Sequence, residues 1–228
     1  MVKDKEYMYS YLLGKSVKID KSDKYSDYNN FIMYLSPHKI SGVNMCPNAS
    51  EGCASACLNT AGRGRFGSTQ HARLQRTLHY IDDRIGFLEA LYKEIMFHSN
   101  KYEKLAIRLN GTSDINWNPF IRKIYDINPN IVFYDYTKNL NQALKSLDMP
   151  NYYVTFSRSE VNEGDCIKAL ESGINVAVVF KNKFPETWNS YPVIDGDITD
   201  TRFLDKQGAV VGLSAKGDAK KDKTGFVV

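Results

Sequence analysis

The feature that most constrains this fold is a regular alternation of short apolar runs with amphipathic stretches. Runs of strand length occur at 104–111, 130–138, 151–159, 174–182, 192–197 and 208–217, and helix-like stretches lie at 117–127, 139–147 and 163–173. Alternating strands and helices are typical of parallel sheets, because a helix must carry the chain back to the start of the next strand. Several runs are apolar almost throughout, as expected where both faces of a sheet are covered.

Two further elements are predicted before this alternation begins. Residues 31–37 have the pattern of a strand that Pro37 ends, and apolar side chains recur every three or four residues from 68 to 99. That period predicts a long helix, or two helices if Gly86 interrupts it. With about seven strands in sequence, a complete or partial parallel β/α barrel fits at least as well as an open doubly wound sheet.

The domain organisation follows from the same pattern. Residues 1–30 are polar and rich in Lys, Asp and Tyr, and we expect them to form a peripheral N-terminal arm. No linker or low-complexity segment divides the rest, so residues 31–228 are predicted to be one α/β domain. The chain has no signal-type apolar run and no window long enough to span a membrane, which favours the cytoplasm, where thiols stay reduced.

Three of the four cysteines are crowded into one stretch, directly after the first predicted strand. Cys46, Cys53 and Cys57 have the spacing C-x6-C-x3-C. Thiolates are soft ligands that select iron–sulfur clusters, zinc or copper(I), and three of them suit a [4Fe–4S] cluster whose fourth iron is open or held by another group. Zinc, with His38 or His71 as a fourth ligand, and unligated or redox cysteines are the alternatives.

Polar side chains follow the ends of the predicted strands. In barrels and open α/β sheets, sites form at the carboxyl ends of the strands, so these side chains are expected to share one charged mouth. The candidate ligand-binding residues are Asn110, Ser113, Asp114, Lys138, Arg158 and Lys216. The charges of this mouth suit a small anionic ligand such as a nucleotide. Cys166, in a helix-like stretch, is predicted to be a buried free cysteine.

A cysteine loop after the first barrel-type strand, facing polar groups at later strand ends, resembles the layout of the radical S-adenosylmethionine superfamily. That resemblance implies a [4Fe–4S] cluster on three cysteines, with S-adenosylmethionine bound at the open iron and along the strand ends. The superfamily's usual spacing is C-x3-C-x2-C, and its glycine-rich segment after the second strand corresponds to residues 110–114 here.

Four pieces of the sequence resemble the gene product 88 family of phage and mobile-element proteins more closely. They are the loop CPNASEGCASACL, the strand end RLNGTSD, the segment FYDYTK and the late stretch IDGDITDTRFLD…VVGLSAKG. This resemblance covers roughly residues 31 to 217 and implies a phage source and a host-cytoplasm location, without implying a reaction. The expected function is therefore an iron–sulfur protein, radical S-adenosylmethionine-like if it is an enzyme. The alternative is a non-catalytic, metal-stabilised binding module for a host protein or nucleic acid.

Overall fold

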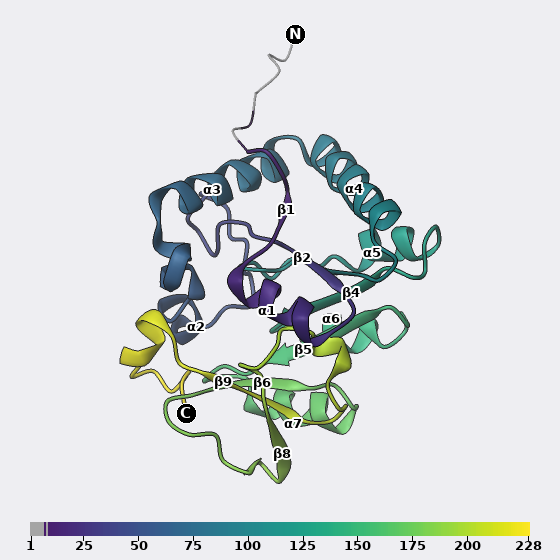
Figure 1. Ribbon diagram of the computed structural model, residues 1–228. Helices are drawn as coiled ribbons and strands as arrows, with labels where there is room; N and C mark the ends of the chain where they lie inside the picture. The colour runs from purple at the N-terminus through teal and green to yellow at the C-terminus, as the bar shows by residue number, and fades with distance from the viewer. Residues whose placement is uncertain (1–6, 8) are drawn as a thin grey trace.

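The computed structural model of the protein describes residue 7 and residues 9–228, and a single nine-stranded sheet lies at its centre (Figure 1). The strands are β1 (Leu13–Gly14), β2 (Asn29–Met33), β3 (Leu105–Arg108), β4 (Val132–Thr137), β5 (Tyr152–Ser157), β6 (Val176–Phe180), β7 (Thr187–Trp188), β8 (Tyr191–Asp195) and β9 (Val210–Ser214). Their order is β1-β2-β3-β4-β5-β6-β9-β8-β7. The body from β2 to β8 is parallel, and the two-residue strands β1 and β7 pair antiparallel at its edges.

Helices connect most of the strands, as the alternation predicts. They are α1 (Val17–Tyr25), α2 (Glu51–Ser55), α3 (Gly67–Asp82), α4 (Arg84–Lys101), α5 (Asn118–Tyr125), α6 (Leu140–Ser146) and α7 (Glu163–Glu171). Four 3-10 turns complete the set: η1 (Leu58–Thr60), η2 (Gly62–Arg65), η3 (Arg202–Leu204) and η4 (Gly217–Lys221). The long helical region is indeed two helices, but the break falls at Asp83, whose carboxylate caps α4 by accepting a 2.9 Å hydrogen bond from the Gly86 amide.

The sheet is mostly parallel, as predicted, but it is not closed. From β2 to β6 the strands lie side by side in sequence order, without the reversal that defines a doubly wound sheet. Within the described part of the chain, β1 pairs only with β2 and β7 only with β8, so the two edges of the sheet do not meet. The expectation of a complete barrel is therefore wrong, because closure needs hydrogen bonds between the first and last strands.

One face of the sheet carries the apolar core. Alternate strand residues point to this face, where they meet α3 to α7. Phe87, Leu91 and Ile95 are fully buried on α4, and Cys166 is fully buried on α7, as predicted for the lone cysteine. Burial raises the pKa of Cys166 to about 12, so this thiol is a neutral, inert part of the core.

The opposite face is polar and aromatic, and it is covered by α1 and by the segment that follows β8 (Figure 1). The Asp200 backbone amide donates a 2.7 Å hydrogen bond to the Ser22 hydroxyl of α1, and the Asp200 carboxylate lies 3.5 Å from the guanidinium of Arg108 on β3. Arg108 also lies over the ring of Tyr136, 4.4 Å from its centroid. Both faces of the parallel sheet are thus covered, which agrees with its apolar strands.

The first thirty residues were expected to form a peripheral arm, and residues 1–6 and 8 lie outside the described part of the chain. The rest of this segment provides β1, α1 and the first residues of β2. Leu12, Leu13 and Ile19 are buried, and Glu94 of α4 accepts hydrogen bonds of 2.9 and 3.0 Å from the amides of Leu12 and Leu13. None of the helices described here has the length and apolar character that crossing a bilayer requires.

Asp135 of β4 gives a prediction for the pH dependence of stability. Its side chain is 1% exposed, and burial raises the pKa of this carboxyl to about 7, although Arg108 and the Asn110 amide favour its charged form. An unfolded aspartate titrates near about 3.9. The folded protein therefore binds more protons between these two values, and its free energy of unfolding falls as the pH rises through this window.

Asp135→Asn removes this titration, so the melting temperature of the variant relative to the wild type should be higher at pH 8 than at pH 5. Thermal denaturation at both pH values measures the difference. Asp148→Asn, at an exposed position, is the control and should shift melting equally at the two pH values. A pH-independent effect of Asp135→Asn would contradict the prediction.

Candidate functional site

The cysteine loop, residues 44–67, lies on the carboxyl-terminal edge of the sheet, as predicted. The chain enters it after β2, and Cys53 lies in α2, whose Ser50 cap accepts a hydrogen bond from the Cys53 amide. The Cys46 thiol lies 3.7 Å from the carbonyl oxygen of Thr112, in the segment after β3. The loop therefore spans neighbouring strand ends.

Asp114 fastens the first part of the loop to the ends of β3 and β4. Its buried carboxylate accepts hydrogen bonds from the Thr137 hydroxyl at 2.6 Å and from the Lys138 amide at 3.1 Å. The side-chain amide of Asn48 donates to the same carboxylate at 3.4 Å, and the Asp114 amide donates to the Met45 carbonyl at 2.9 Å. One carboxylate thus fixes two strand ends and the loop segment beside Cys46.

Glu160, just after β5, fastens the second part. Its carboxylate accepts 2.7 Å hydrogen bonds from the Ser50 hydroxyl and from the Gly52 amide. Partial burial would raise the pKa of Glu160, but these hydrogen bonds lower it below its usual value. Gly52 is packed tightly: an added Cβ would come within 2.7 Å of the Phe226 Cβ and would collide with Thr224. The helix that carries Cys53 is therefore held between β5 and residues 222–228.

The three thiols of the loop interact electrostatically with one another. Proximity of Cys53 and Cys57 raises the pKa of Cys46, although burial is the main reason why that pKa reaches about 11. Burial also raises the pKa of Cys57, and Cys53 adds to the rise. Backbone amides donate to two of the sulfurs, from His38 to Cys46 at 3.4 Å and from Asn59 to Cys57 at 3.5 Å. The thiols are thus half-buried, mutually close and partly hydrogen-bonded.

Two cations lie beside Cys57. Arg73 of α3 and Lys138 each favour the thiolate of this residue. The Arg73 guanidinium is buried, donates to the side-chain oxygen of Asn59 and lies over the Tyr34 ring at 4.7 Å. Burial lowers its pKa. Neither cation forms an ion pair with a carboxylate of the described residues, so both can offset negative charge on the cysteine sulfurs.

The thiols do not form a ready-made site for a single ion. In the part of the chain that the structure describes, no three His, Cys, Asp or Glu side chains are grouped so that they could hold one metal ion. All four cysteines are free of disulfides. The zinc alternative with His38 or His71 as fourth ligand is therefore not assembled, and His38 contributes its backbone amide rather than its ring.

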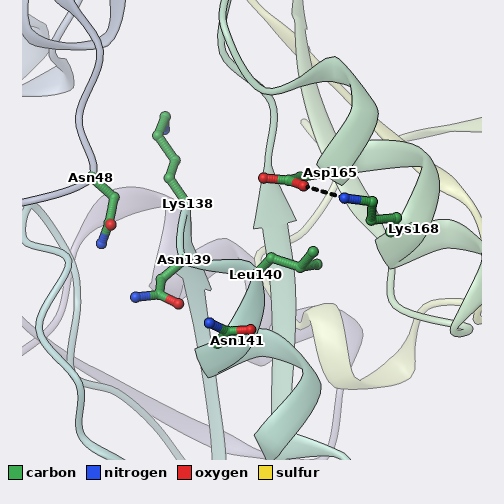
Figure 2. A pocket seen from close by; sticks show the side chains of 7 residues that line it. All are labelled: Asn48, Lys138, Asn139, Leu140, Asn141, Asp165 and Lys168. Carbon is green, nitrogen blue, oxygen red and sulfur yellow. Dashed lines mark hydrogen bonds and ion pairs between the residues drawn. The ribbon is translucent and has the colours of Figure 1, made fainter.

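A solvent-open pocket of about 460 Å³ adjoins the loop (Figure 2). It is lined by Asn48, Lys138, Asn139, Leu140, Asn141, Asp165 and Lys168. In Figure 2 the Lys138 side chain stands between Asn48 and Asp165, while Asp165 is paired with Lys168 at 3.2 Å. Lys138 thus reaches both the pocket and the neighbourhood of Cys57.

The other predicted ligand-binding residues have partners within the protein. The Asn110 side-chain oxygen accepts hydrogen bonds from the Ser113 hydroxyl, the Ile115 amide and the Trp117 indole, between 2.9 and 3.1 Å. Arg158 donates to the carbonyl oxygens of Gly225 and Phe226 at 2.6 and 2.9 Å. Lys216 pairs with Asp197 at 2.7 Å. Of the six, Asp114 is hydrogen-bonded to the cysteine loop, and Lys138 interacts electrostatically with Cys57.

Several residues of the site were not foreseen. Asn48 lies inside the cysteine motif and Glu160 follows a predicted strand, so their positions alone could have drawn attention to both. Phe226 gave no such signal: it packs with Ala56 and Ala215 and lies under the Lys138 ammonium, 5.6 Å from its ring centroid. Its role depends on residues 222–228 returning to β6, where Val228 exchanges hydrogen bonds with Val179 and Lys181.

The packing of Gly52 gives a prediction with a matched control. Gly52→Ala inserts a methyl group between α2 and residues 222–228, and it should lower the free energy of unfolding by about 1–3 kcal/mol. Gly164 also lies in a helix, but an added Cβ meets nothing within 4 Å, so Gly164→Ala should raise stability by about 0.5–1 kcal/mol. Urea denaturation measures both. Equal effects of the two substitutions would show that α2 is not tightly held.

Comparison with known proteins identifies a family but no individual relative. No curated protein and no solved structure is significantly similar to the chain. A family model described as gene product 88 matches residues 12–228, which is nearly the whole sequence. This match confirms the resemblance to phage gene products, and it extends beyond the cysteine loop to the sheet and to residues 222–228. The chain belongs to the gene product 88 family.

Proposed function

We propose that the protein binds a [4Fe–4S] cluster through Cys46, Cys53 and Cys57 and presents it to a small anionic ligand at the edge of the sheet. One observation carries this proposal. The three thiols interact electrostatically with one another, and Lys138, which interacts with Cys57, also lines the adjoining pocket. The three cysteines alone would not distinguish a cluster from a structural metal. Their position beside a pocket favours a cluster that takes part in the protein's function.

The residues present fit such a cluster in three respects. The three thiols come from one loop and interact electrostatically with one another, as ligands that share one cluster would. Amides donate to the sulfurs of Cys46 and Cys57, and such hydrogen bonds tune cluster potentials. Arg73 and Lys138 supply positive charge near Cys57. Binding would release the protons that the buried thiols hold.

A cluster of this kind supplies single electrons and, where one iron lacks a cysteine, a coordination position for a ligand. The chain itself would bind the ligand. The Lys138 ammonium attracts an anionic group, and the side-chain amides of Asn48, Asn139 and Asn141 offer hydrogen-bond donors and acceptors around it. S-adenosylmethionine is one candidate, on a partial barrel like that of the radical enzymes: its carboxylate would pair with Lys138, while its sulfonium and ammonium groups are cationic. The resemblance of the layout to the radical S-adenosylmethionine superfamily supports this more specific proposal.

The alternative function is a metal-stabilised binding module without catalysis. One observation favours it: Arg158 donates to the carbonyls of residues 225 and 226, so part of the predicted mouth is covered by the chain itself. In that case a cluster or zinc would fasten the loop, and a host protein or nucleic acid would bind elsewhere. Replacing Lys138 and Arg158 by alanine would then leave partner binding intact.

Metal analysis of anaerobically purified variants tests the cluster. The wild-type protein should contain about four irons and four sulfides per chain and absorb visible light. Cys53→Ser should lose most of this iron, because one of three ligands is removed. Cys166→Ser is the control and should keep it, since Cys166 is buried in the core on α7. About one zinc per chain, or iron that is equally low in both variants, would contradict the cluster.

The ligand requires a separate measurement on reconstituted, reduced protein. S-adenosylmethionine should bind in equilibrium dialysis, and Lys138→Ala should weaken that binding about tenfold, because a charge-assisted contact is lost. Lys123→Ala, at an exposed position on α5, should change nothing. A protein that carries the cluster but neither binds nor cleaves S-adenosylmethionine would remove the radical version and leave the iron–sulfur assignment standing.

A further inference from the structure

Exposed cations gather on the cysteine loop and on the segment that begins at η4. The turn η2 presents Arg63 and Arg65, and the segment from η4 onward presents Lys220, Lys221 and Lys223, all of them exposed. The two segments are separated by 150 residues but lie side by side: an added Cβ at Gly217 would come within 3.0 Å of the Ala61 Cβ. In Figure 1 the short yellow helix after β9 lies beside α2.

This basic patch, Arg63, Arg65, Lys220, Lys221 and Lys223, is not neutralised. None of its five cations forms an ion pair with a carboxylate in the described part of the chain. Two carboxylates, Asp218 and Asp222, lie on the same segment, and Asp222 accepts hydrogen bonds from the backbone amides of residues 224, 225 and 227. Positive charge therefore exceeds negative charge across the patch.

Large apolar side chains are exposed among these cations. Phe66, directly after Arg65, is 53% exposed. Leu58 is 55% exposed on η1, which directly precedes η2 in the chain. Glycine and arginine alternate over Gly62–Arg65, and the exposed ring of Phe66 follows directly. Arginine and an aromatic ring side by side offer phosphate pairing together with base stacking, which is the combination used by proteins that bind single strands. An acidic protein surface would pair with the same cations, so the test below includes an acidic polymer.

We infer that the basic patch binds single-stranded nucleic acid, with the phosphates on the five cations and a base stacked on Phe66. This binding does not use the three cysteines or the pocket around Lys138, because none of the patch residues is a thiol or lines that pocket. It gives the cysteine loop a second role, since the loop supplies η1 and η2. In this role Arg63 and Arg65 bind phosphates of the nucleic acid and do not offset charge on the cysteine sulfurs.

Fluorescence anisotropy with a labelled oligothymidylate of about 15 nucleotides tests this inference on the full chain. The affinity should fall as the salt concentration rises. Each phosphate contact to a single strand contributes about −0.7 to the slope of log K against log salt concentration, so the five cations should give a slope of about −3.5. Arg63→Ala and Arg65→Ala should each make the slope shallower by about 0.7. Phe66→Ala should weaken binding roughly five- to hundredfold without changing the slope, because it removes stacking but no charge.

Lys93→Ala on α4 and Lys123→Ala on α5 are the controls, since both are exposed and Figure 1 shows these helices on the opposite side of the molecule. They should leave affinity and slope unchanged. Absence of binding at low salt, equal weakening by the controls, or polyglutamate binding where the oligonucleotide does not would each overturn the inference. Iron and sulfide content is measured on the same samples. A loss of nucleic-acid binding can then be told apart from a loss of the proposed cluster.

Discussion

Two carboxylates at the ends of parallel strands hold the cysteine loop on the sheet, and the rest of the site depends on them. Asp114 joins the ends of β3 and β4 to the segment beside Cys46, and Glu160 anchors the start of α2, which carries Cys53. A parallel sheet brings the ends of all its strands to one edge, so short polar side chains there can fasten a long loop. Without these contacts the segments that carry Cys46 and Cys53 would lose the carboxylate hydrogen bonds that fix them to the strand ends.

The charges around the loop divide into two groups with different surroundings. Arg73 and Lys138 lie near Cys57 and can offset negative charge on sulfur. Arg63 and Arg65 come from the same loop, yet they are exposed on the far side of η2. The loop thus has an inner face directed at the sheet and an outer face directed at solvent. In our two proposals the metal and small ligand would occupy the inner face and a nucleic-acid strand the outer one.

Much of the fold could be predicted because it is encoded locally. The apolar runs that became β3 to β6, β8 and β9, and the periodic stretches that became α3 to α7, depend on hydrophobic patterns within a few turns of chain. Gly173 ends α7 with a φ of 82°, as a glycine after a helix-like stretch suggests. The placement of the cysteine loop at the carboxyl edge followed from its position after a strand.

The remaining features depend on contacts between distant residues. Whether a sheet closes is decided by pairing between its first and last strands, and β1 and β7 are only two residues long, so local sequence gave no sign of either. The return of residues 222–228 to β6 covers Arg158, which therefore meets carbonyl oxygens instead of a ligand. Asn110 follows β3, close to the predicted strand end, but its side chain organises the turn around Trp117.

The most direct measurement of the central claim is native mass spectrometry of the anaerobically reconstituted protein. We predict a mass increase equal to one [4Fe–4S] cluster per chain, present in the wild type and in Cys166→Ser and absent in Cys53→Ser. A protein that takes up a single zinc ion, or no metal at all, under the same conditions would contradict the assignment of Cys46, Cys53 and Cys57 as cluster ligands.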